Sequence, residues 1–235
     1  MLDMTPLSAR VSLLGVTPPN DFYDKIELYA VRLIEKNRVM NLTAVDEKDV
    51  IARHFSDSIE AAGVVDFSGR SIIDVGCGAG FPGLPLKLLF PSSSLTLLDS
   101  TAKKVAFLEE LVTELGLDGV TCVAARAEEA AGIPDMRENF DFAVSRAVAA
   151  MPALLELCLP FVRVGGSFVA YKTARSAEEI ETGRRAARLL GGRFAWERDY
   201  EVLAGAENRL IGVEKISQTP SKYPRKYSKI KKEPL

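Results

Sequence analysis

The chain has 235 residues, a hydrophobic fraction of 47% and a formal net charge of −2. This length suits one large α/β domain with at most a small appendage, and the composition is typical of a globular protein with a buried core. The sequence shows no apolar run of roughly 20 residues, no secretory signal in Met1–Arg10, and only three scattered cysteines. We therefore expect a cytoplasmic monomer that binds neither a membrane nor a metal.

Two amphipathic helices are predicted before the first strand. One covers Asp21–Asn37, and the other begins near Asp46, runs to about Ala62 and ends at Gly63. Their apolar residues recur at helical spacing and are Phe22, Ile26, Tyr29 and Leu33, followed by Ile51, Phe55 and Ile59. Since no linker follows them, we expect residues 1–66 to form a helical layer of a single domain.

From residue 71 onward, predicted strands alternate with predicted helices. The strands are 72–75, 95–98, 120–124, 142–144, 165–171, 194–203 and 209–216, and the helices are 84–90, 103–115, 151–161 and 176–190. Such alternation indicates an α/β fold with a doubly wound, mostly parallel seven-stranded sheet, whose last strand is antiparallel. We expect residues 67–214 to form this core and to bind a ligand at the carboxyl ends of the strands.

The first of these strands runs into a glycine-rich turn. Asp74 is followed by Gly76, Gly78 and Gly80 at alternate positions, and a helix starts a few residues later. Glycine allows the backbone to approach a ligand closely, and a helix N-terminus attracts anions. Gly78–Gly83 also fits the G-x-G-x-x-G pattern of dinucleotide sites, so a dinucleotide and a different nucleotide-like cofactor are both possible ligands. A merely tight turn is the structural alternative.

Asp74 favours one of these cofactors. A carboxylate at the end of the strand would be unfavourable beside a pyrophosphate but favourable near a sulfonium and its ammonium group. The string from Asp74 to Gly80 resembles motif I of the class I S-adenosylmethionine-dependent methyltransferases. That resemblance implies an acid at the end of the second strand, and Asp99 is there. Since a dinucleotide ribose would also accept Asp99, this residue does not separate the two cofactors.

Polar residues follow two further strands. Ala127 and Glu128 come after the third strand, where they could contact a cofactor or simply begin a helix, since acids favour the first turn. Arg146 ends the fourth strand, where a permanently charged guanidinium suits a phosphate, a carboxylate or a base edge. A surface salt bridge is the alternative. For His54, the only histidine, a structural role is the favoured interpretation.

The last 21 residues form a basic tail. They hold seven of the 30 basic residues and one of the 32 acidic ones, so the preceding 214 residues have 23 basic and 31 acidic side chains and a formal charge of −8. Lysines and arginines alternate with Tyr223 and Tyr227, which suggests phosphate neutralisation and base stacking. The alternative is a disordered tail without a partner.

Together these stretches resemble one family, the ribosomal RNA small subunit methyltransferase G family (RsmG, also called glucose-inhibited division protein B, GidB). The matching strings occur in the same order over most of the chain. They are Asn41-Leu42-Thr43, Arg53-His54…Asp57-Ser58, Asp74–Gly83 with Gly-Phe-Pro, Leu98-Asp99-Ser100, Arg126-Ala127-Glu128, Ser145-Arg146-Ala147 and Lys222-Tyr223-Pro224-Arg225-Lys226.

The resemblance implies the class I methyltransferase (Rossmann-like) fold and transfer of a methyl group from S-adenosylmethionine to N7 of a guanine in 16S ribosomal RNA. The partner would be this RNA or a ribosomal particle. The implied cofactor-binding residues are Asp74, Gly76, Gly78, Gly80, Phe81, Asp99, Ala127, Glu128 and Arg146. Arg146 is also the implied catalytic residue, and the implied substrate-binding residues are Arg146, Lys172, Lys222, Tyr223, Arg225 and Lys226.

The implied reaction needs little chemistry from the protein. Guanine N7 has an unprotonated lone pair at neutral pH, so alignment of the reacting atoms would suffice without a general base. The competing functions are a nicotinamide-dependent oxidoreductase, an RNA-binding module without activity and a small-molecule methyltransferase. The basic tail speaks against the last of these, and the intact glycine turn with Asp99 speaks against the second.

Overall fold

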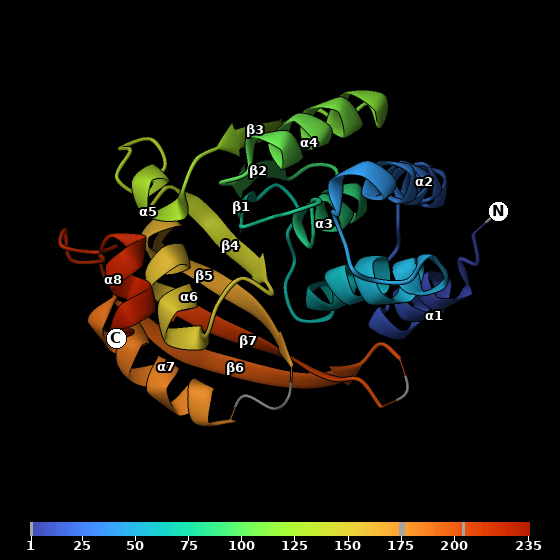
Figure 1. Ribbon diagram of the computed structural model, residues 1–235. Coiled ribbons are helices and arrows are strands. Elements are labelled where there is room, and N and C mark those ends of the chain that lie inside the picture. Colours follow the sequence, from blue (N-terminus) through green and yellow to red (C-terminus); the bar gives the residue numbers. More distant parts are fainter. Residues whose placement is uncertain (1, 174–176, 204) are drawn as a thin grey trace.

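Figure 1 shows the computed structural model, which describes residues 2–173, 177–203 and 205–235. Within these residues, one sheet is formed by β1 (Ser71–Val75), β2 (Ser94–Asp99), β3 (Val120–Ala124), β4 (Phe140–Arg146), β5 (Val162–Thr173), β6 (Gly192–Glu201) and β7 (Glu207–Lys215). The order is β3-β2-β1-β4-β5-β7-β6. Strand β7 is antiparallel to both neighbours, whereas β1 to β5 pair in parallel, so the predicted sheet is confirmed.

Helices of the core follow the predicted segments closely. They are α3 (Gly83–Leu89), α4 (Ala102–Glu114), α6 (Met151–Cys158) with the short 3₁₀ turn η4 (Leu159–Phe161), and α7 (Ala177–Leu189). Residue 176, the first of one predicted helix, lies outside the described residues. Ala127 and Glu128 begin the short helix α5 (Ala127–Ala130), as one of their two interpretations predicted, whereas the short helix α8 (Tyr227–Lys232) was not predicted, since six residues are too few for a helical pattern to show.

The N-terminal layer differs in detail from its prediction. Helix α2 (Phe22–Met40) has the predicted buried face, and α1 (Thr5–Leu14) precedes it. The second predicted helix is instead three short turns, which are η1 (Glu47–Asp49), the π-helical η2 (Ile51–Ser56) and η3 (Ile59–Gly63). In this segment, side chains bond to backbone carbonyls that would otherwise belong to one regular helix. Ser56 Oγ donates to the Ile51 carbonyl, and Ser58 Oγ donates to the His54 carbonyl. The predicted apolar stripe is nevertheless buried.

Each face of the sheet buries its own apolar cluster. Helices α1 to α4 and the η2–η3 segment cover one face, and α5 to α8 cover the other (Figure 1). Because the strands lie between two layers, their carboxyl ends are left as an open edge at which a ligand can bind. Among the described residues, every helix is too short or too polar to cross a membrane.

The basic tail folds against the amino-terminal edge of the sheet. The backbone amides of Ile216 and Ser217 donate to Gly191, and Arg137, just before β4, donates to the carbonyls of Thr219 and Tyr223. Helix α8 then packs against α6 and buries Ile230 completely. The alternative of a disordered tail is therefore wrong.

Candidate functional site

The glycine turn forms one wall of a cavity at the carboxyl edge of the sheet. Gly76, Gly78 and Gly80 all have positive φ, of 73°, 58° and 102°. A Cβ at Gly76 would lie 2.6 Å from a methyl carbon of Val148, and one at Gly80 would lie 2.5 Å from the Tyr29 hydroxyl, so packing explains both glycines. A Cβ at Gly78 would meet nothing within 4 Å, so the backbone is open to a ligand there.

Asp74 lies beneath this turn and is not part of the cavity wall. Its carboxylate is fully buried and accepts a hydrogen bond of 2.7 Å from the backbone N–H of Gly83, where α3 begins. Burial raises the pKa of Asp74 to about 7, although the Gly83 bond acts in the opposite direction. Asp74 therefore organises the junction of the turn with α3.

Asp99 holds the turn from the end of β2. Its Oδ2 accepts from the backbone N–H of Gly78 at 2.9 Å, and its Oδ1 accepts from that of Thr101 at 2.8 Å. Ala127 and Glu128, which begin α5, lie near Asp99 because the backbone N–H of Ala125, just before them, donates to the Asp99 carbonyl. The structure thus brings Asp99, the turn and the start of α5 to one side of the carboxyl edge, although Asp99, Ala127 and Glu128 are not cavity-lining residues.

Phe81 is the centre of an aromatic stack. Its ring is parallel to Tyr29 at a centroid distance of 5.2 Å and to His54 at 4.5 Å, and Phe55 meets it edge-on. The guanidinium carbon of Arg146 lies 5.1 Å from the Phe81 ring centre. Phe81 therefore supports His54 and Arg146 and lines the cavity only in part, since it is 5% exposed.

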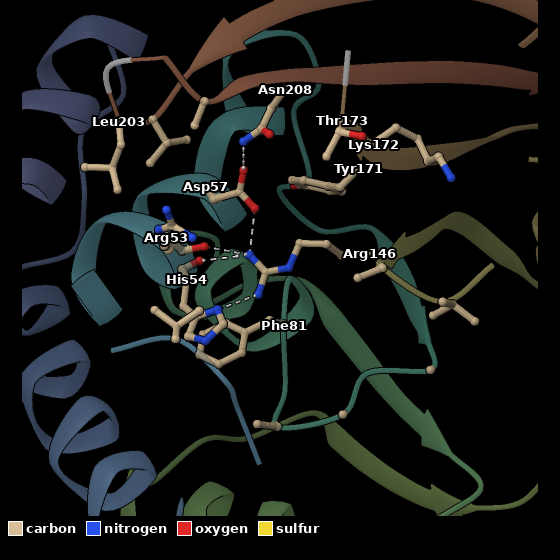
Figure 2. Close-up of a pocket in the computed structure, with 18 of the residues that line it drawn as sticks. Arg53, His54, Asp57, Phe81, Arg146, Tyr171, Lys172, Thr173, Leu203 and Asn208 are labelled. Carbon is tan, nitrogen blue, oxygen red and sulfur yellow. Dashed lines mark hydrogen bonds and ion pairs between the residues drawn. The ribbon is translucent and has the colours of Figure 1, made fainter. Parts of the chain in front are cut away.

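Arg146 leaves the end of β4 and is held by the η2 turn on the opposite side of the cavity (Figure 2). Its Nη1 donates to Asp57 Oδ2 at 2.6 Å and to the carbonyls of Arg53 and His54 at 3.2 and 3.4 Å. Its Nη2 donates to His54 Nδ1 at 3.0 Å. Within the described residues, the Nε–H is left without a hydrogen-bond partner, so Arg146 is fixed yet retains a donor for a ligand.

The contacts of His54 define its tautomer. A guanidinium can only donate, so Nδ1 must accept from Arg146, and the ring proton is on Nε2, which donates to Thr43 Oγ1 at 2.6 Å. Burial, followed by the positive charges of Arg146 and Arg53, lowers the pKa of His54 to about 3. The imidazole is therefore neutral at physiological pH, and both of its nitrogens are engaged.

Asp57 connects Arg146 to the β6–β7 hairpin. While Oδ2 pairs with Arg146, Oδ1 accepts from Asn208 Nδ2 at 3.1 Å (Figure 2). The same Oδ1 also accepts from the Tyr200 hydroxyl at 2.7 Å. Tyr171, from β5, donates to the carbonyl of Ser58 next to Asp57. Three strands, β4, β6 and β7, therefore meet at the Asp57 carboxylate, and Asp57 is only 6% exposed.

The cavity as a whole has a volume of about 980 Å³ and combines many of the predicted site residues. Its lining includes Gly76, Gly78, Phe81, Arg146 and Lys172 among the predicted residues, and Leu42, Val45, Arg53, His54, Asp57, Tyr171, Tyr200 and Asn208 among those that were not predicted. Lys172 reaches the carbonyl of Ala149 at 3.0 Å and Glu179 at 2.6 Å, so it fixes the segment between β4 and α6.

The predicted tail residues do not reach this cavity. Arg225 donates three hydrogen bonds to the fully buried carboxylate of Glu156 on α6. Tyr223 is 7% exposed, and the cations of Lys222 and Arg225 lie 5.2 and 6.0 Å from its ring centre. Tyr223 is thus a packing residue of the tail and cannot stack on a base in this conformation. Lys226 is exposed on the same distal side.

Sequence reasoning did not single out Asp57, Tyr200 or Asn208. A signal existed for Asp57, because Arg53, His54 and Asp57 are ionisable residues close together in the sequence, and His54 and Asp57 are spaced to share a face of a helix. Tyr200 and Asn208 gave no such signal, since only the antiparallel pairing of β6 with β7 places them side by side. Among the described residues, His, Cys, Asp and Glu form no cluster suited to a metal ion.

Solved structures with the same fold define the class of this protein. A crystal structure of an S-adenosylmethionine-dependent O-methyltransferase from Thermotoga maritima matches with a TM-score of 0.56 at 16% identity, covering 80% of this chain and 73% of that one. The complex of M. jannaschii TYW2 with AdoMet matches with a TM-score of 0.52 at 13% identity, covering 65% and 72%. The fold is that of the class I S-adenosylmethionine-dependent methyltransferases.

Sequence comparisons define the family. A family model described as rRNA small subunit methyltransferase G (GidB) matches residues 22–195. A protein of Acetivibrio thermocellus named ribosomal RNA small subunit methyltransferase G is 44% identical over 223 residues, which cover 94% of this chain and 92% of that protein. A protein of Geobacillus kaustophilus with the same name is 44% identical over 237 aligned residues and covers both chains fully. The chain belongs to the rRNA small subunit methyltransferase G family, as its sequence motifs predicted.

Proposed function

We propose that this protein transfers a methyl group from S-adenosylmethionine to N7 of a guanine in small-subunit ribosomal RNA. Family membership supports the RNA substrate, and the class of fold supports the cofactor. The observation that carries the choice of N7 is the state of His54. The imidazole, which would be the natural base near neutral pH, has both nitrogens engaged, and N7 needs no base.

The cavity fits S-adenosylmethionine in size and in chemistry. About 980 Å³ lies between the glycine turn and Arg146, which is the range for a nucleoside-sized ligand together with a base. Gly78, in the cavity wall, would hold the nucleoside together with the adjoining carboxylate of Asp99, and the start of α5 at Ala127 and Glu128 would flank an adenine that extends beyond the cavity lining. When bound, the cofactor would supply an electrophilic methyl group on a sulfonium.

The contribution of the protein would be alignment. Arg146 is fixed by Asp57 and the η2 carbonyls, and its unpaired Nε–H can donate to guanine O6. A donor at O6 holds the edge of the base that also contains N7 and leaves the N7 lone pair free for the methyl group. The apolar rim formed by Leu42 and Val45 would exclude water from the reacting atoms.

The decisive experiment is nucleoside mapping of small-subunit rRNA. RNA from cells lacking the protein is incubated with purified protein and S-adenosylmethionine, and the methylated nucleoside is identified by mass and chromatography against N7-, N1- and N2-methylguanosine standards. We expect one N7-methylguanosine per RNA. Another methylated nucleoside would disprove the N7 assignment, and no transfer to RNA at all would disprove the activity.

A further inference from the structure

Helix α8 displays an exposed cluster of positive charge that the proposed reaction does not use. The cluster consists of Lys226, Lys229, Lys231 and Lys232, which we call the lysine patch, and all four are exposed. Within the described residues, none of them forms an ion pair, in contrast to the tail cations Lys215 and Arg225. Glu233 is the one acid of the tail. Four cations without an ion pair among the described residues therefore face solvent on α8 and on the residue just before it.

The support beneath the lysine patch is rigid. Ile230 is fully buried between the lysines, and Arg225 immediately before the helix is locked to Glu156, which is also fully buried. Upstream, the guanidinium of Arg137 donates to backbone carbonyls of the tail. Because α8 is already ordered, a ligand of the lysine patch would pay little additional entropy for backbone ordering.

The lysine patch is far from the cavity. Arg146 ends β4 at the carboxyl edge, whereas the residues that anchor the tail, Arg137 and Glu138, precede β4 at the amino edge. The seven residues of β4 separate these edges by roughly 20 Å at about 3.3 Å per residue. Helix α8 lies beside α6 (Figure 1), and no tail residue is among those that line the cavity.

The distribution of charge over the protein favours the lysine patch as a separate contact for RNA. The first 214 residues have 23 basic and 31 acidic side chains, so the body of the protein repels a polyanion overall. RNA is therefore favoured where cations gather, and among the described residues such places include the cavity, with Arg53, Lys104 and Arg146, and the lysine patch.

We propose that the lysine patch binds the phosphate backbone of a segment of ribosomal RNA other than the one that carries the target guanine. This inference rests on the proposed function and adds to it the kind of RNA that the protein recognises. The RNA substrate must therefore be long enough to reach from the cavity around α6 to α8, or it must be folded so that two of its segments contact both places. A short hairpin that contains only the target loop lacks this second contact.

The test compares two variants on two RNAs. In the patch variant, the four lysines are replaced by glutamine. In the control variant, four cations of α2 on the opposite face of the sheet are replaced by glutamine, namely Lys25, Arg32, Lys36 and Arg38. Their ion pairs are exposed and contribute little to stability, so both variants lose the same charge and should remain folded. The RNAs are full-length small-subunit rRNA and the short hairpin of the mapped target loop.

Binding is measured by fluorescence anisotropy with S-adenosylhomocysteine present, over a range of salt concentrations, so that the result does not depend on methyl transfer. We expect the patch variant to bind full-length rRNA at least about tenfold more weakly and to lower the slope of log K against log salt by about 3, since each phosphate contact contributes about 0.7–0.9. Binding of the hairpin should change less than about twofold. Replacing only Lys231 and Lys232 should lower the slope by about half as much.

Three results would overturn the proposal. The first is an equal loss of full-length rRNA binding in the patch and control variants, which would indicate net charge alone. The second is an equal loss on hairpin and full-length RNA, which would place the patch at the target loop. The third is unchanged rRNA binding by the patch variant; loss of binding to phosphatidylserine vesicles in that variant would then assign the patch to a membrane instead. Failure of the wild type to methylate either RNA would disprove the proposed function and leave the binding result valid.

Discussion

Two arginines at opposite edges of the sheet show how differently one side chain can be used. Arg146 and Arg225 are both mostly buried, and each pairs with a buried carboxylate at 2.6 Å. Arg225 directs its Nε and Nη2 to the two oxygens of Glu156, so each charge satisfies the other. Arg146 makes only one bond to Asp57, which it shares with Tyr200 and Asn208, and its remaining bonds are to neutral acceptors.

From this difference we propose that Arg225 forms a structural ion pair and that Arg146 acts on a ligand. The charge of Arg225 is cancelled by a two-point contact, whereas part of the positive potential of Arg146 is available to a ligand in the cavity. Sequence reasoning named both residues as candidates for substrate binding, and only the geometry of their partners distinguishes them. The predictions below test this distinction, beginning with the largest effect.

Arg146→Ala should reduce methyl transfer to rRNA by about a thousandfold, because the donor that positions the base is lost. The measurement is single-turnover transfer with saturating S-adenosylmethionine, alongside a thermal melt. Arg146→Lys keeps the charge but not the planar fork and should recover only a small part of the activity. Transfer by Arg146→Ala at more than a tenth of the wild-type rate would show that this residue does not position the base.

Arg225→Ala should act on stability instead. It leaves the fully buried carboxylate of Glu156 without its partner, which typically costs about 3–5 kcal/mol. Urea unfolding measures the loss, and transfer to the short hairpin, measured at a temperature where the variant is folded, should be close to the wild-type rate. The double variant Arg225→Met with Glu156→Leu should regain most of the stability, since it removes both charges. A large loss of hairpin methylation in the folded variant would contradict the structural role of Arg225.

Tyr200→Phe tests whether the β6–β7 hairpin helps to hold Arg146. The change removes one hydrogen bond to Asp57 Oδ1, a net loss of about 1 kcal/mol in stability. Because Asn208 still donates to that oxygen, transfer should fall by no more than about tenfold, a loss of about 1.4 kcal/mol. Tyr171→Phe is the matched control, since its hydroxyl donates to the Ser58 carbonyl and not to Asp57. Equal loss of transfer in both variants would indicate a general packing effect.

Much of the architecture could be predicted from the sequence because its signals are local. The apolar strands, the stripe of α2 and the glycine turn are all visible as short patterns, and motif order was enough to indicate the family. Asp74 was singled out as a cofactor-binding residue, whereas its position beneath the turn depends on how α3 packs, which no pattern shows. The split of the second helix, similarly, follows from side chains that bond to its backbone carbonyls, including Arg146, which is 93 residues downstream of Arg53 and 92 downstream of His54.

The partners of each charge were the part that could not be predicted. Glu156 is an unremarkable acid in a helical pattern, yet it decides that Arg225 is structural. Likewise, the contact between Asp57 and Asn208 joins residues 151 positions apart and depends on the register of β6 and β7. Functional assignment of single charged residues therefore required long-range geometry, whereas the fold did not.

A final prediction concerns pH and the groups that surround Arg146. The folded pKa of His54, about 3, is below its unfolded value of 6.5, so its contribution to stability is complete above pH 6.5 and is lost as pH falls toward 3. The folded pKa of Asp74, about 7, is above its unfolded value of 3.8, so its contribution is present below pH 3.8 and is lost as pH rises toward 7. Between pH 3.8 and 6.5 the two contributions change in opposite directions, so together His54 and Asp74 should alter the wild-type stability little.

Single variants should separate these two effects. His54→Gln lacks the imidazole whose protonation in the unfolded state lowers wild-type stability in acid. Between pH 6.5 and 4 this variant should therefore gain stability relative to the wild type as pH falls. In Asp74→Asn, which keeps an oxygen acceptor for Gly83, the variant should gain relative to the wild type as pH rises from 4 to 7. Each slope is at most about 1.4 kcal/mol per pH unit. Parallel curves for the two variants in urea unfolding would contradict the assignment, because opposite signs follow directly from a buried neutral imidazole and a buried carboxyl group at the same edge of the sheet.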